Sequence, residues 1–148
     1  MRALVQRVDR AAVRLPGDQT RAIGRGLLIY LGVGRQDSPE TAMKLSRKIS
    51  GLRIFSNAEG KFDRSVLDEK GEALVISQFT LYGDPKGGRR PDFTAAAASE
   101  QARTLYERFV ELLRETGVLA RTGEFGAAMS VESVNDGPVT LWLDTDLF

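Results

Sequence analysis

The sequence contains neither cysteine nor histidine. These two absences exclude disulfides, thiolate nucleophiles, imidazole general bases and the usual zinc ligands. Any hydrolysis must therefore use hydroxyls, carboxylates, lysines, backbone amides, a metal held by carboxylates, or groups that belong to the substrate. We expect no cofactor and no bound metal.

A long apolar run is also missing. The amino-terminal stretch 1–8 is interrupted by charges and has no signal-peptide core, and no segment is long enough to span a membrane. We therefore expect a chain with no membrane partner and, by default, a cytoplasmic location.

The chain has no large excess of either charge, because 21 basic residues nearly balance 20 acidic ones. A net charge of +1 predicts no strong non-specific attraction to nucleic acid, although a local basic patch is compatible with it. A chain of 148 residues, 42% of them hydrophobic, is long enough for one well-buried domain and short for two. We expect a single domain over residues 1–148.

The stretch 73–82 has the apolar pattern of a buried strand, but polar side chains interrupt it. Ser77, Gln78 and Thr80 lie among residues that favour burial, and buried polar groups need hydrogen-bond partners. Residues 83–85, Gly-Asp-Pro, predict that the strand ends there. The polar cluster then lies beside a loop, where functional sites are common.

A regular strand would separate these side chains. Gln78 and Thr80 would share one face, and Ser77 and Phe79 the other, so all four can line one pocket only if the backbone bends or ends there. The alternative is that the polar groups satisfy only one another and the following turn.

Two amphipathic helices are predicted. Ser38-Pro39 supplies an N-cap and a first-turn proline for a helix over residues 38–51. A second helix begins at Ser99 with an apolar stripe and stops at Gly117. We interpret the aromatic residues of that stripe as core.

Strands are predicted from short apolar or alternating segments. Gly24-x-Gly26 lies at the start of the segment 23–33, before its apolar residues, and no helix opens there, so we reject a dinucleotide-binding motif. A turn is expected at residues 16–19. The predicted strands cover residues 2–9, 11–15, 23–33, 53–55, 65–67, 73–82, 129–133 and 139–143.

Two connecting segments need separate interpretation. Residues 84–93 combine glycine, proline and positive charge directly after the polar strand end, which suits phosphate contacts but equally a solvated connection. Asn135-Asp136-Gly137-Pro138 has the composition of a simple hairpin turn between two strands. Whether its Gly-Pro bond is cis cannot be derived from the sequence.

Together, the two segments Ser77-Gln78-Phe79-Thr80-Leu81 and Asn135-Asp136-Gly137-Pro138-Val139-Thr140 resemble the two signature motifs of the D-aminoacyl-tRNA deacylases. The similarity runs the full length of the chain. It includes residues 1–8, Leu52-Arg53-Ile54-Phe55, Gly60-Lys61, Arg90-Pro91 with Phe93, and Thr122-Gly123 before Phe125. Outside the signatures, four positions differ from the residues that are usual in this family: Asp63, Gly87, Asp92 and Ala128.

The resemblance implies an α/β fold of two β-sheet layers with helices packed on one side, and a homodimer that hydrolyses D-aminoacyl-tRNA. It assigns one pocket wall, including the catalytic groups, to Ser77, Gln78, Phe79 and Thr80. Gly137 and Pro138, joined by a cis bond, would reach in from the other subunit to bind the substrate and reject L-amino acids. Glycyl-tRNA, which has no side chain to reject, would be a second substrate.

The implied reaction is compatible with the missing histidine. An aminoacyl ester is activated by its own ammonium and by the vicinal ribose hydroxyl, so the enzyme needs less help from a protein base. Backbone N–H groups near Phe79 and Thr80 would stabilise the oxyanion, and the tRNA 2′-OH would orient the attacking water. Thr80 as covalent nucleophile is the weaker hypothesis. Two alternatives remain: a tRNA-end binding module without catalysis, and an editing domain for a mischarged L-amino acid.

Overall fold

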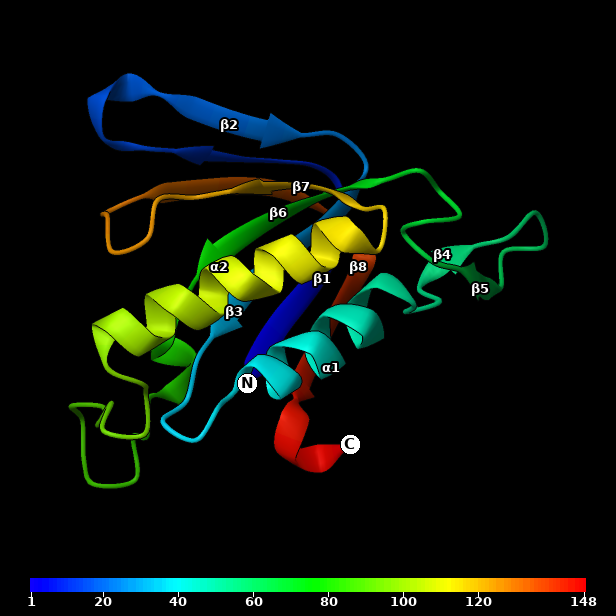
Figure 1. Cartoon of the computed structure of the whole chain (residues 1–148). Coiled ribbons are helices and arrows are strands. Elements are labelled where there is room, and N and C mark those ends of the chain that lie inside the picture. The colour runs from blue at the N-terminus through cyan, green and yellow to red at the C-terminus, as the bar shows by residue number, and fades with distance from the viewer.

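Strand β1 (Arg2–Arg14) is the central element of the fold, because it pairs with three other strands in the computed structural model, which describes residues 1–148 (Figure 1). Its first half lies antiparallel to β3 (Gly26–Gly32), and its second half is antiparallel to β2 (Thr20–Ile23). Strand β8 (Ser130–Asp144) runs antiparallel to β1 over almost its whole length. The segments 2–9 and 11–15, predicted as two strands, are therefore one strand.

The other half of the sheet is parallel. Strands β6 (Glu72–Ser77) and β7 (Leu119–Thr122) follow β3 in the order β3-β6-β7. Helix α1 (Pro39–Ser50) lies between β3 and β6 in the chain, and helix α2 (Ser99–Glu115) lies between β6 and β7. Both helices cover the same face of the sheet (Figure 1). This arrangement aligns the carboxyl ends of the parallel strands near the start of α2.

The main core lies between the two helices and the sheet. Apolar side chains from both helices pack there against alternate residues of the strands. Its fully buried members include Val5, Ile29, Leu45, Ile49, Val75, Phe109 and Leu113.

A second core lies where the hairpin of β1 and β2, closed by the 3₁₀ turn η1 (Pro16–Asp18), folds over β3 and β6. Val13 and Ile23 on the hairpin are buried in one cluster with Leu28 and Leu74. Arg21 ties the hairpin to β7 by donating to the Thr122 carbonyl (2.9 Å). The expected α/β fold with two β layers and helices on one side is confirmed, and both layers belong to one hydrogen-bonded sheet.

The two predicted helices are confirmed almost to the residue. Ser38 is the N-cap of α1 and accepts from the Thr41 N–H, and Pro39 occupies the first turn. Helix α2 begins at Ser99, and Gly117, with φ +101°, follows its end. Neither helix is long and apolar enough to cross a membrane.

Several strand predictions were wrong at their boundaries. Ile23 belongs to β2, so β3 begins only at Gly26. Residues 65–67 form a turn held by Asp68, which accepts from the Ser65 N–H and hydroxyl, both at 2.7 Å. The small sheet next to this turn consists of β4 (Phe55–Ser56) and β5 (Phe62–Arg64), whereas a strand was expected at 53–55.

The predicted hairpin turn at residues 135–138 is absent. These residues lie within β8, and the strand continues past them in the same direction along β1. The pairing register shifts between Gln6 and Arg10, so the extra residues are accommodated as an irregularity opposite β1. A short motif of turn-forming residues therefore forms a bulge here, because β1 provides a partner on both sides of it. The carboxyl-terminal residues form a last 3₁₀ turn, η3 (Thr145–Leu147).

Candidate functional site

The polar cluster lies where β6 ends, which is at Ser77 and not at residue 82 as predicted. Gln78 leaves the strand conformation, with φ −143° and ψ 79°, and the 3₁₀ helix η2 (Phe79–Tyr82) follows. The Gln78 N–H still donates to the Leu31 carbonyl of β3 (2.8 Å). This change of conformation removes the strand alternation, so Ser77, Gln78 and Phe79 all line the same cavity.

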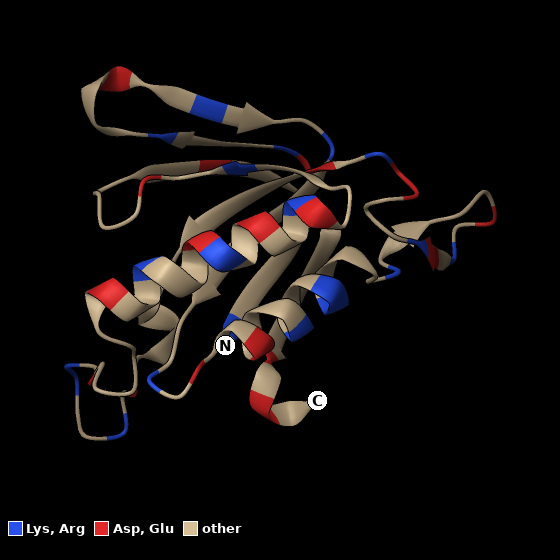
Figure 2. Cartoon of the chain, viewed as in Figure 1, with Lys and Arg blue, Asp and Glu red and all other residues tan.

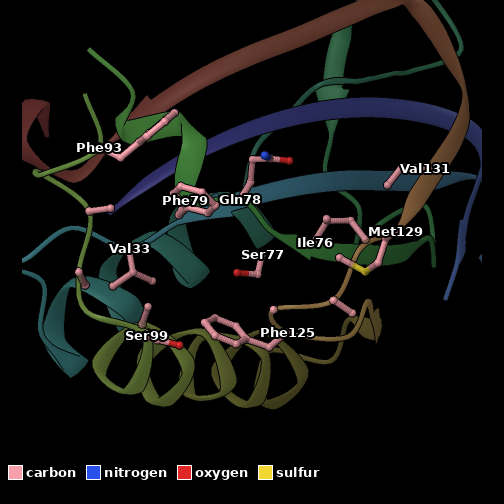
Figure 3. A pocket seen from close by; sticks show the side chains of 15 residues that line it. Val33, Ile76, Ser77, Gln78, Phe79, Phe93, Ser99, Phe125, Met129 and Val131 are labelled. Carbon is pink, nitrogen blue, oxygen red and sulfur yellow. The ribbon is translucent and has the colours of Figure 1, made fainter. Parts of the chain in front are cut away.

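The cavity has a volume of about 620 Å³ and is lined mainly by apolar residues (Figure 3). In Figure 3 the Ser77 side chain projects into this space, with Phe125 and the first turns of α2 on one side of it. The lining comprises Val33, Ile76, Ser77, Gln78, Phe79, Phe93, Ala96, Ala97, Ser99, Ala102, Phe125, Gly126, Ala127, Met129 and Val131.

Thr80 lies outside this lining, is exposed, and accepts a hydrogen bond from the side-chain amide of Gln78. This is its only side-chain contact of that kind, and the amide nitrogen of glutamine is a donor without basic character. Phe79 is exposed as well and packs edge-on against Phe93, with ring centroids 5.2 Å apart. The two aromatic rings thus form one border of the cavity.

Contacts from β1 hold η2 in place. Arg2 donates to the Leu81 carbonyl (3.1 Å), pairs with Asp144 (2.9 Å) and stacks on the ring of Tyr82 (4.3 Å). The Tyr82 hydroxyl donates to Asp37 (3.3 Å), and burial together with the nearby Asp37 carboxylate raises the pKa of Tyr82. Tyr82 therefore stays protonated, and η2 is held both by Arg2 of β1 and by Asp37 in the connection between β3 and α1.

Sequence reasoning missed the role of the loop between β7 and β8. The Gly123 N–H donates to the Val75 carbonyl (3.0 Å), which brings the loop back to β6, and Phe125 and Met129 then line the cavity. A Cβ on Gly123 would lie 2.7 Å from the Met129 sulfur, so any other residue at this position would displace the Met129 side chain. Met129 was interpreted as a strand residue, and no local pattern distinguishes it.

The second signature belongs to β8 and lies at the level of the first residue of β6, at the opposite end of that strand from the cavity. Gly137 and Pro138 are exposed, the bond between them is cis, and Gly137 has φ +114°. Asn135 holds the segment by donating to the carbonyls of Arg7 (2.9 Å) and Val139 (3.0 Å).

The strand register shows why the two signatures are apart within one chain. Val8 pairs with both Asn135 and Gly26, and Gly26 pairs with Glu72, the first residue of β6. The cavity lies beyond Ser77, the last residue of that strand. The chain therefore brings Ser77, Gln78 and Phe79 together but does not bring Gly137 and Pro138 to them. No group of three or more acidic side chains in the structure could hold a metal ion.

Comparisons with known proteins agree on one family. A family model described as D-Tyr-tRNA(Tyr) deacylase matches residues 4–144. A D-aminoacyl-tRNA deacylase from Thermotoga petrophila is 54% identical over 145 residues, covering 98% of this chain and 97% of the relative. One from Roseiflexus sp. is 53% identical over 148 residues, covering 100% of this chain and 96% of the relative.

Solved structures share the fold. A protein named c-Myc DNA Unwinding Element Binding Protein superposes with a TM-score of 0.91 at 43% identity, covering 97% of this chain and 98% of the other. A probable eukaryotic D-amino acid tRNA deacylase superposes with a TM-score of 0.83 at 20% identity, covering 96% and 97%.

Proposed function

Because the chain belongs to the D-aminoacyl-tRNA deacylase family, we propose that the cavity at the end of β6 is where it hydrolyses the ester bond of D-aminoacyl-tRNA. The observation that carries this proposal is the break in β6 after Ser77, which brings Ser77, Gln78 and Phe79 of the first signature to one cavity. A volume of about 620 Å³ is in the usual range for small-molecule sites and suits the aminoacyl-adenosine end of tRNA.

The chemistry uses backbone donors and the substrate itself. Water attacks the ester carbonyl, and the resulting oxyanion accepts from the backbone N–H groups of Phe79 and Thr80, which open η2 and have no acceptor within that turn. The carbon–oxygen bond to the ribose then breaks, and the ribose oxygen takes a proton as it leaves. One well-placed oxyanion donor contributes roughly 3–4 kcal/mol of transition-state stabilisation.

Thr80 acts in this scheme as a positioning hydroxyl. Its oxygen accepts from the Gln78 amide, so its own proton points elsewhere and can orient the substrate or the water. The Gln78 amide cannot remove that proton, which argues against Thr80 as a covalent nucleophile. The tRNA 2′-OH orients or activates the attacking water in place of a histidine.

A second copy of the chain completes the site. Within one chain the Gly137-Pro138 segment lies at the opposite end of β6 from the cavity, and it is exposed. In the proposed homodimer this segment enters the partner's cavity, where its backbone carbonyls leave no room for an L side chain. Glycyl-tRNA has no side chain to reject and is a second substrate. We place the reaction in the cytoplasm.

Deacylation of matched D- and L-tyrosyl-tRNA by the purified, EDTA-treated protein tests the proposal. Release of the D ester alone, at a rate unaffected by EDTA, is the expected result. Release of both esters would contradict the Gly137-Pro138 screen.

The same assay separates two other functions. Binding of aminoacyl-tRNA without release would identify a binding module, and this is the second candidate because one structural relative is named for binding to DNA. Release of the L ester alone would identify an editing domain for mischarged L-amino acids.

A further inference from the structure

We propose that the loop of residues 84–92, here called the basic loop, binds phosphates of the tRNA strand that carries the ester. The inference rests on the proposed function and identifies where the nucleic acid lies relative to the cavity. It is carried by three exposed cations on the basic loop, Lys86, Arg89 and Arg90 (Figure 2).

The basic loop is anchored at the cavity. Asp84 and Asp92 close it through two backbone hydrogen bonds, of 2.7 and 2.9 Å. The next residue, Phe93, lines the cavity and packs on Phe79. A Cβ on Gly83 would lie 2.9 Å from the Phe93 ring, so the two ends of the loop are in close contact. A strand that places its ester beside Phe79 therefore passes next to this loop.

The cations of the basic loop are available for a ligand. None of the side chains of Lys86, Arg89 and Arg90 makes a hydrogen bond or an ion pair within the chain. The two acidic residues of the loop are turned to its backbone instead. Asp84 accepts from the Lys86 N–H (2.9 Å), and Asp92 accepts from the Thr94 N–H (2.5 Å).

The charge on Asp92 is fixed by its hydrogen bonds. Those from Thr94 hold the pKa of Asp92 below its usual value. Gly88, with φ +137° and open space around it, permits the sharp turn that separates Lys86 from the two arginines. The loop thus presents cations on two sides of one turn.

Phosphodiesters are the ligand that this chemistry fits. Lysine and arginine neutralise backbone phosphates without reading sequence, and the guanidinium fork matches two phosphate oxygens. The net charge of the whole chain is only +1, so a general attraction to nucleic acid is weak and a local contact has to supply the affinity.

The test compares two substrates with the variant K86Q/R89Q/R90Q. D-Tyrosyl-tRNA carries phosphodiesters, whereas 3′-O-D-tyrosyl-adenosine has the same ester and none. We expect kcat/KM on the tRNA to fall by about 10- to 100-fold while kcat/KM on the adenosine ester is unchanged. The salt dependence on tRNA should also weaken, by about 0.7 in slope for each phosphate that the variant no longer neutralises.

A matched control removes three other exposed cations, in the variant R47Q/K61Q/K70Q. Lys61 lies on the β4–β5 hairpin, at the other end of the molecule from the basic loop (Figure 1). This variant should retain wild-type kcat/KM on both substrates.

Three results would overturn the inference. Equal losses on tRNA and on the adenosine ester would mean that the loop shapes the cavity and does not hold phosphate. Equal losses in the control would mean that the attraction is general, and no loss in the loop variant would mean that the loop does not contact tRNA. If the wild-type protein cleaves neither ester, the proposed function is wrong. Binding of uncharged tRNA to the wild type and to the loop variant then tests the loop separately.

Discussion

The contact between Gln78 and Thr80 separates two mechanisms at the scale of single residues. A threonine that acts as nucleophile needs a neighbour that takes its proton, whereas a positioning threonine needs only a neighbour that fixes its rotamer. The structure provides a glutamine amide, which meets only the second need.

Replacing Thr80 by valine tests this interpretation. We expect T80V to keep measurable deacylation of D-tyrosyl-tRNA, with kcat reduced by about 10- to 100-fold, since the variant lacks one positioning hydroxyl. With a D-tyrosyl-tRNA whose terminal ribose lacks the 2′-OH, we expect the kcat of the wild-type protein to fall by more than it does for T80V on normal D-tyrosyl-tRNA. Single-turnover deacylation measures both. Complete loss with T80V and no loss with the deoxy substrate would favour the covalent mechanism.

Arg2 is a second residue with a testable role, because it joins η2 to the sheet. We expect R2M to lower the free energy of unfolding by about 2–3 kcal/mol, since a charged hydrogen bond is removed and the buried Asp144 carboxylate loses its positively charged partner. If η2 carries the oxyanion donors, kcat should also fall by about tenfold with little change in KM.

Urea unfolding and steady-state kinetics measure these two effects of R2M. The control is R14M, which removes an exposed arginine on the other half of β1 and should change neither quantity. A loss of stability with unchanged kcat would make Arg2 purely structural.

At the scale of secondary structure, the close packing of β3 against β6 depends on one glycine. A Cβ on Gly26 would lie 1.9 Å from the Glu72 carbonyl oxygen, where no side chain can move away. We expect G26A to lower the free energy of unfolding by about 3 kcal/mol or more. G87A, in open space on the basic loop, should change it by less than about 0.5 kcal/mol. Equal stability of both variants in urea would show that the strands can separate without loss.

The elements that could be predicted from the sequence are those with local signals. Ser38 and Pro39 mark the start of α1, and the apolar stripe marks α2, because helix ends and faces depend on residues within a few positions. The end of β6 was predicted too late, since Phe79 and Leu81 are apolar and the change to a 3₁₀ turn depends on Arg2 and Asp37 from elsewhere in the chain. The segment 135–138 was misinterpreted for a similar reason, because its partner β1 is distant in sequence.

The residues of the candidate site also divide into those with a local sequence signal and those placed by distant parts of the chain. The resemblance assigned one pocket wall to Ser77, Gln78, Phe79 and Thr80. The structure brings the first three to the cavity, whereas Thr80 lies outside its lining. Phe125 and Met129 were not identified as cavity residues, because the loop that carries them returns to β6 only through a backbone hydrogen bond.

At the scale of the whole molecule, the proposed dimer predicts that subunits share their sites. One variant, S77W, blocks the cavity but keeps Gly137 and Pro138, and a second, with Gly137-Pro138 replaced by two alanines, keeps the cavity but loses the screen. Alone, the first should release neither ester, and the second should release both D- and L-tyrosine.

Mixing the two variants distinguishes sites shared between subunits from sites within one chain. With the blocked variant in about tenfold excess and the subunits allowed to exchange, most intact cavities are paired with an intact Gly-Pro segment. We expect L-ester release per intact cavity to fall toward zero while D-ester release persists. An unchanged L-ester rate would mean that the segment acts within its own chain.

The position of β1 also has a consequence for synthesis of the chain on the ribosome. Arg2 pairs with Asp144, 142 residues later, so β1 is made long before its longest partner, β8. Until then, one edge of β1 has no partner, and exposed strand edges promote association between nascent chains. The complete sheet therefore forms only after translation of β8, and a ribosome stalled before β8 would hold a chain that lacks the Gly137-Pro138 segment.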